Sequence, residues 1–113
     1  MVLSYSMKAV LLHKSRTTLT VTSGRTIAIY ADTFRLQGVK DSSSWQAYRF
    51  SWIAFDPDEP GARVLFDCHE PKGPHCHIDG EEVGQAFPWK GLKEAEEFFF
   101  QKVEERFGKI RKE

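Results

Sequence analysis

The sequence predicts an α+β fold, an antiparallel meander of five or six strands with one C-terminal helix packed on a face. Apolar and polar residues alternate with period two through much of residues 8–78, as in half-buried strands. Apolar residues then recur at three- and four-residue steps from 91 to 107, as in an amphipathic helix. The 113 residues suit a single domain, 1–113. Within it, we expect residues 1–6 to be unstructured, and Met7 is a candidate natural start.

The strands are expected in chain order, separated by residues that favour turns. Ser23-Gly24 indicates a hairpin turn, residues 37–44 a polar loop, and the Pro/Gly-rich segment 56–61 another turn. Trp52 shares a strand face with Tyr48 and Phe50, which predicts that it lies in the core. The expected strands are residues 8–13, 17–22, 26–34, 46–55, 63–68 and 75–78.

The helix is expected to bury one stripe of side chains and to end at Gly108. The run Phe98 to Phe100 is wider than one helix face. Either Phe98 or Phe100 is therefore exposed for a partner, or the helix is buried on several sides. The expected stripe is Leu92, Ala95, Phe99, Val103 and Phe107.

Composition limits the function classes. Sixteen Lys and Arg balance sixteen Asp and Glu, so the chain lacks the basic excess of proteins that bind nucleic acid by charge alone. A local cationic site is compatible with this balance. The apolar runs are too short for a membrane span, and two cysteines are too few for a disulfide framework. We expect a cytoplasmic protein with reduced thiols and no membrane partner.

Three of the four histidines and both cysteines lie between Asp67 and His77. In an extended segment His75 and His77 project to one face and Cys76 to the other. One imidazole could take a proton from a ribose 2′-hydroxyl while the other donates one to the leaving oxygen. Lys72 could stabilise charge on the phosphoryl oxygens, and Asp67 or Glu70 could orient an imidazole. This chemistry needs no metal and no cofactor.

Other interpretations of the same segment stay open. Cys and His ligate zinc, but there is no Cys-x-x-Cys pair and Cys76 points away from its histidine neighbours. A histidine-rich turn can also be a solvated hairpin without function. Arg49 is either a phosphate ligand or a charge on a solvated sheet face, and His13 is interpreted as structural.

The chain resembles the TumE family, small toxin-like proteins of bacterial and archaeal toxin–antitoxin pairs. The resemblance rests on the opening 7–12, a Gly-turn hairpin, the strand 48–50, the run 66–78 and Phe87 before the helix. Within the Lys-Gly-x-His-x-His motif and before it, the matching residues are Asp67, Lys72, Gly73, His75 and His77. Cys68 stands where members often have Asn, Phe66 replaces a usual Tyr, and His69 also departs from the pattern, which implies altered activity.

The resemblance implies a toxin with a helix-turn-helix antitoxin as its partner. Combined with the histidine chemistry, it predicts a metal-independent endoribonuclease with His75, His77, Lys72 and Asp67 as catalytic residues. Arg49 and Gly73 are expected to contact the RNA substrate. The alternatives are a non-catalytic binding or regulatory module of the same family and a small metal-binding protein. The chain is also a candidate homodimer.

Overall fold

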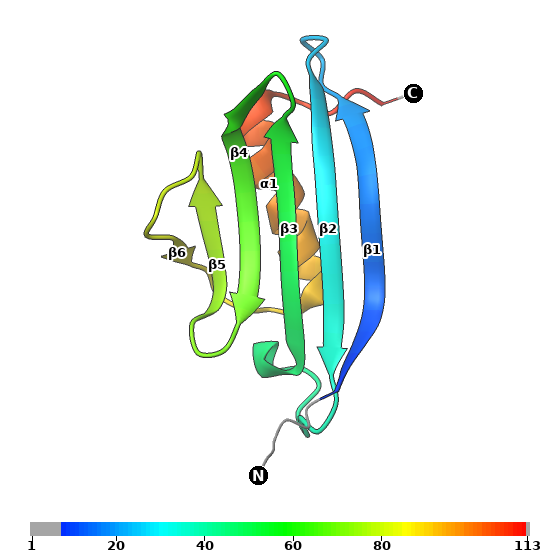
Figure 1. Cartoon of the computed structure of the whole chain (residues 1–113), viewed down its shortest axis with the longest axis vertical. Helices are drawn as coiled ribbons and strands as arrows, with labels where there is room; N and C mark the ends of the chain where they lie inside the picture. The colour runs from blue at the N-terminus through cyan, green and yellow to red at the C-terminus, as the bar shows by residue number, and fades with distance from the viewer. Residues whose placement is uncertain (1–7, 113) are drawn as a thin grey trace.

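The computed structural model describes residues 8–112, which form one six-stranded antiparallel sheet with strands in chain order and a single α-helix (Figure 1). This confirms the expected meander with a C-terminal helix. The expectations for residues 1–6 and Met7 lie outside the described residues. The elements are β1 (Ala9–Thr20), β2 (Thr26–Leu36), a 3₁₀ turn (Trp45–Ala47), β3 (Tyr48–Asp56), β4 (Glu59–His69), β5 (Gly73–Ile78), β6 (Gln85–Ala86) and α1 (Leu92–Phe107).

The two strands expected before Ser23 are one continuous strand, β1. The polar residues Lys14, Ser15 and Arg16, which separate the expected strands 8–13 and 17–22, all pair with residues of β2. Arg16 also forms an ion pair with Asp32 across the two strands, at 3.0 Å. A polar stretch stays in a strand when a long partner satisfies its backbone and its side chains face solvent.

One face of the sheet is covered by α1, which lies behind β3 and β4 in Figure 1. Phe66, fully buried, is central to this core and packs against Phe87, Phe98 and Phe99 with ring centroids 4.9, 5.4 and 5.2 Å away. Trp52 is buried as predicted, and its indole N–H donates to Thr33 Oγ1 at 2.8 Å. These contacts anchor the central strands of the sheet.

The helix follows the predicted pattern. Its buried residues are Ala95, Phe99, Val103 and Phe107, and Gly108 follows with φ +103°. Of the two phenylalanines considered for exposure, Phe98 packs against the core whereas Phe100 is 40% exposed. No helix among residues 8–112 is both long and apolar enough to span a membrane.

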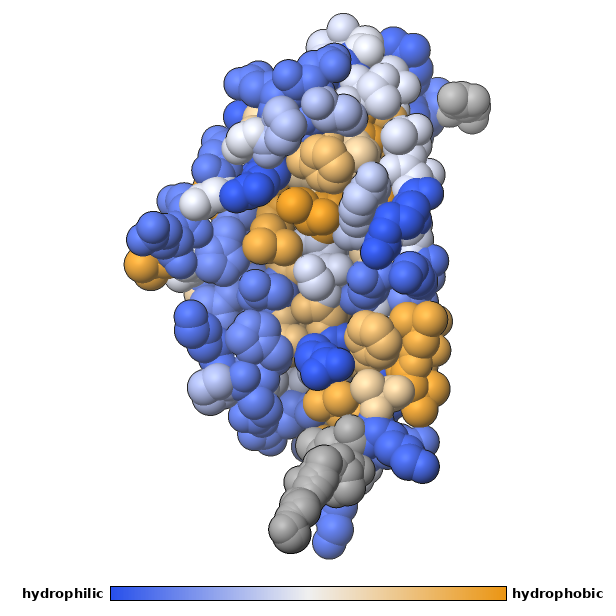
Figure 2. Space-filling view, in the orientation of Figure 1, coloured by the Kyte–Doolittle hydropathy of each residue, from blue (hydrophilic) through white to orange (hydrophobic). Residues whose placement is uncertain are grey.

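The opposite face of the sheet, called the open face below, is the one turned toward the viewer in Figures 1 and 2. Period-two alternation places there the strand residues that do not point at α1. Figure 2 shows apolar side chains along the middle of this face, with hydrophilic side chains around them. A second apolar group lies over the N-terminal part of β1, where Val10, Leu11 and Leu12 are exposed.

Candidate functional site

Strand register arranges the open face in transverse rows, each crossing the sheet from β5 to β1. We call two of them the first and second rows. Neighbouring positions in a row are about 4.8 Å apart, and successive rows about 7 Å apart. The first row consists of His75, Asp67, Ser51, Asp32 and Lys14. The second row consists of His77, Leu65, Ile53, Tyr30 and Arg16.

His75 and His77 lie on the open face side by side, as their spacing predicted. Their ring centroids are 6.5 Å apart. His75 Nδ1 is 3.0 Å from the Gly73 carbonyl, and His77 Nδ1 is 2.9 Å from the Glu81 carbonyl. Because a carbonyl only accepts, each Nδ1 must donate. Each neutral ring therefore keeps its lone pair on Nε2, where it can take up a proton.

Asp67 lies on β4 beside the two histidines. It pairs with His75 across β4 and β5, and its Oδ2 is 3.8 Å from His77 Nε2. The two groups form an ion pair when the imidazole is protonated. A methyl group on Gly84, in the loop between β5 and β6, would lie 2.6 Å from His77 Nε2. His77 is thus held between a carboxylate and a close-fitting loop.

The motif residues before the histidines lie in the turn between β4 and β5. Lys72 is exposed there, so its long side chain can reach an anion bound on the surface. Gly73 is buried, has φ +77°, and approaches Trp45 so closely that a Cβ would lie 3.1 Å from the indole. This contact explains why the position holds glycine. A contact between Gly73 and substrate stays a prediction.

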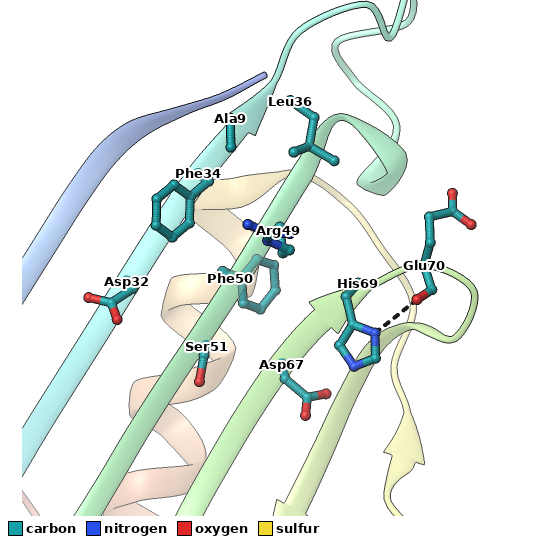
Figure 3. A pocket seen from close by; sticks show the side chains of 10 residues that line it. All are labelled: Ala9, Asp32, Phe34, Leu36, Arg49, Phe50, Ser51, Asp67, His69 and Glu70. Carbon is teal, nitrogen blue, oxygen red and sulfur yellow. Dashed lines mark hydrogen bonds between the residues drawn. The ribbon is translucent and has the colours of Figure 1, made fainter. Parts of the chain in front are cut away.

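A shallow groove of about 690 Å³ opens beside the histidines, on the same face (Figure 3). Asp67 lines it and so joins the groove to the histidine pair. Arg49, exposed on β3, also lines it, with its guanidinium 5.6 Å from the Phe34 ring centroid. The structure therefore places the predicted phosphate ligand Arg49 in the groove next to the site.

Two further residues of the groove were given no role from the sequence. His69 lies on the open face, and its Nδ1 is 2.9 Å from the Glu70 carbonyl, which leaves Nε2 free as in the other two imidazoles (Figure 3). Its position two residues after Asp67 on a strand was a signal that could have found it. Ser51 faces Asp67 across β3 and β4, a pairing that only the register reveals.

The cysteines lie on the other side of the sheet. Cys68 and Cys76 are both buried in the core beneath α1, so Cys76 does point away from His75 and His77. Burial raises the pKa of the Cys68 thiol to about 12 and also raises the pKa of Cys76. Both thiols stay protonated near neutral pH, the form that is neither a good nucleophile nor a good metal ligand.

The metal-binding alternative has no geometric support in the described part of the chain. Among residues 8–112, no three His, Cys, Asp or Glu side chains converge in a way that could hold a metal ion. The groups that can act chemically at this site are the imidazoles, the carboxylate and the nearby cations.

In comparisons with known proteins, no family model, no curated protein and no solved structure matches the chain. The resemblance to the TumE family stays a prediction that rests on the sequence motif.

Proposed function

We propose that the protein is the toxin-like component of a toxin–antitoxin pair and cleaves RNA without a metal at the His75–His77 pair. One observation carries the proposal. Two imidazoles lie on one sheet face, each with Nδ1 donating to a backbone carbonyl, and the Asp67 carboxylate lies opposite His75 and 3.8 Å from His77 Nε2. That arrangement fits general acid–base catalysis of phosphodiester transfer.

The proposed reaction is a transesterification within the RNA strand. His75 Nε2 takes the proton of a ribose 2′-hydroxyl, whose oxygen then attacks the adjacent phosphorus. As the bond from phosphorus to the 5′-oxygen breaks, protonated His77 donates its Nε2 proton to that oxygen. The products are a 2′,3′-cyclic phosphate and a 5′-hydroxyl.

The roles of the two histidines follow from Asp67. Its carboxylate lies 3.8 Å from His77 Nε2, where it faces the proton that an acid at this position carries, so we assign the acid role to His77 and the base role to His75. Lys72 and Arg49 are the proposed cations for the phosphoryl oxygens, Lys72 from the turn between β4 and β5 and Arg49 from the groove.

The distribution of charge supports a polyanionic substrate on this face. On the open face between the Phe34–Arg49 and Phe55–Arg63 pairs, four described side chains are Lys or Arg and two are carboxylates. They are Lys14, Arg16, Arg49 and Arg63 against Asp32 and Asp67. Helix α1 has the opposite bias, with five Glu against three Lys and Arg. In this window of the open face cations therefore exceed carboxylates by two, with Glu70 at the edge of the groove, and this local excess favours an anionic substrate.

Cleavage of labelled single-stranded RNA by the purified protein in EDTA tests the reaction. We expect His75→Ala and His77→Ala each to lower the rate about 10²- to 10⁴-fold, the usual contribution of one acid or base. His13→Ala is the matched control, because His13 is an exposed imidazole on β1 outside the site. Intact RNA with the wild-type protein, or full activity of His75→Ala, contradicts the proposal.

The toxin role has its own test. Expression of the wild-type chain is expected to arrest bacterial growth, while His75→Ala is not. Co-expression of a helix-turn-helix protein encoded next to this gene is expected to restore growth. Equal growth arrest by His75→Ala would show that the toxicity does not depend on the proposed site.

A binding module without catalysis is the second candidate. The observation that favours it is the half-buried apolar pair Ile53 and Leu65, which lies directly beside the histidines on an otherwise uncovered sheet face. A protein that leaves RNA intact in the assay above, yet binds the neighbouring helix-turn-helix protein through this face, would establish the module.

A further inference from the structure

Tyr30 is an exposed aromatic side chain in the middle of the open face. It is 44% exposed although β2 is flanked by strands on both sides. Its ring packs edge to face against Phe55, with centroids 5.3 Å apart and planes at 82°. Phe55 therefore supports the ring without burying the residue, which stays 44% exposed.

Tyr30 shares the second row with the proposed acid, His77. Ile53 and Leu65 occupy the two positions between them, and the row ends at Arg16. Three strand spacings separate Tyr30 from His77, or about 14 Å. Apolar side chains thus form a continuous floor from the histidines to the aromatic ring.

Cations lie directly beside the exposed ring. The Arg16 guanidinium lies over one face of the Tyr30 ring, with its carbon 4.9 Å from the ring centroid, so a base would stack on the other face. Arg16 donates two hydrogen bonds to Asp32, at 3.0 and 3.2 Å. Lys14 lies next to Asp32 on β1. A strand that reached Tyr30 would therefore meet positive charge for its phosphates at that point.

A second pair of the same kind lies nearer the groove, where Arg49 is 5.6 Å from the Phe34 ring. Phe34 and Arg49 are cross-strand partners, as Tyr30 and Arg16 are. An accessible ring beside a guanidinium is the combination by which proteins bind single-stranded nucleic acid, through base stacking and phosphate contacts together. Duplex RNA keeps its bases stacked internally and cannot use such rings.

We propose that the open face binds single-stranded RNA across the strands, with an unpaired base stacked on Tyr30 and the scissile phosphate at His75 and His77. This inference rests on the proposed function and adds the class of substrate and a base subsite away from the reacting atoms. The phosphates between the base subsite and the cleaved bond would lie near Arg49 and Arg63, which flank the two rows.

Binding is measured on the His75→Ala/His77→Ala double variant, which leaves the RNA intact, by fluorescence anisotropy of a labelled single-stranded oligoribonucleotide. Adding Tyr30→Ala is expected to weaken binding about 5- to 150-fold, the effect of losing one stacked base. Adding Tyr30→Phe is expected to retain binding, because stacking needs the ring and not the hydroxyl. A hairpin duplex is expected to bind more weakly than the single strand.

Phe100→Ala provides the matched control, because Phe100 is similarly exposed but lies on α1. It should leave RNA affinity unchanged. An abasic site in the oligonucleotide that abolishes the effect of Tyr30→Ala on affinity would support stacking directly. Melting temperatures are measured for all variants. If Tyr30→Ala melts close to Tyr30→Phe, its weaker RNA binding comes from the lost ring and not from unfolding.

The outcomes separate the subsite from the proposed function. Equal RNA affinity with and without Tyr30→Ala, or equal binding of duplex and single strand, overturns the subsite, and cleavage by the wild type would still stand. If the wild type cleaves no RNA and the double variant binds none, both proposals fail. If Tyr30→Ala instead breaks a homodimer seen by gel filtration, while RNA is not bound, the open face is a protein interface and the inference is wrong.

Discussion

The close fit of the β5–β6 loop against His77 makes Gly84 a sensitive position for the candidate site. The change Gly84→Ala would place a methyl group 2.6 Å from both Cε1 and Nε2 of the imidazole and 3.0 Å from Cδ2. Carbon atoms in contact prefer separations of about 3.5–4.0 Å. The ring or the loop must therefore move by about 1 Å.

The expected effect on stability is small and the effect on catalysis is large. A ring that rotates away from the methyl loses the hydrogen bond from Nδ1 to the Glu81 carbonyl, which is worth about 0.5–1.5 kcal/mol. A loss of this size lowers the melting temperature of a chain this long by about 4 °C. The same displacement moves Nε2 from its place beside Asp67, and about 1 Å of misplacement costs about 100-fold in rate.

The assay pairs two measurements on each variant, melting temperature by calorimetry and the rate of RNA cleavage. Gly61→Ala is the matched control, since a Cβ there meets nothing within 4 Å. Nuclear magnetic resonance of the His77 ring reports whether the imidazole has moved. A Gly84→Ala protein that cleaves RNA at the wild-type rate although its His77 signals have shifted would refute the role given to His77. A rate loss of equal size in Gly61→Ala would show that the effect is not local.

Three further predictions concern the fold around the site. Hydrogen bonding from Arg25 lowers the pKa of Asp56, so this carboxylate contributes stability that is present above its unfolded pKa of about 3.9 and is lost as pH falls through the lowered folded value. Urea unfolding should show that lowering the pH from about 4 to about 2 reduces the free energy of unfolding less in Asp56→Asn than in the wild type. Equal reductions would contradict a stabilising ion pair between Arg25 and Asp56. The buried thiol of Cys68, with a pKa of about 12, should resist iodoacetamide at pH 8 until the protein unfolds; rapid native labelling, located by peptide mass spectrometry, would contradict its burial. Gly73→Ala should lower the free energy of unfolding by about 1–2 kcal/mol because φ there is +77° and the methyl presses on Trp45, and a urea midpoint equal to that of the wild type would argue against this strain.

The features that the sequence predicted correctly depend on local periodicity. Alternation within one strand was enough to place His75 and His77 on one face and Cys76 on the other, and the structure confirms it. The same argument placed Trp52 in the core. The helical stripe was equally clear because Phe99 and Val103 recur at helical spacing and face the sheet.

The features that were missed depend on neighbours across strands. The polar segment from Lys14 to Arg16 lacks the strand pattern, and only its pairing with β2 shows that it continues the strand. The alignment of Tyr30 with His77 depends on the register of four strands, which the turn lengths decide. Charge was balanced along the chain, and only the fold separates it between the open face and α1.

The ends of the RNA fragments test the central claim most directly. The wild-type protein is incubated in EDTA with a single-stranded RNA, and the new ends are identified by mass spectrometry. Acid–base catalysis by His75 and His77 predicts 2′,3′-cyclic phosphate and 5′-hydroxyl ends, their absence with His75→Ala, and no cleavage next to a 2′-deoxy position. Fragments with 5′-phosphate ends, cleavage beside a 2′-deoxy position, or RNA that stays intact would contradict the account.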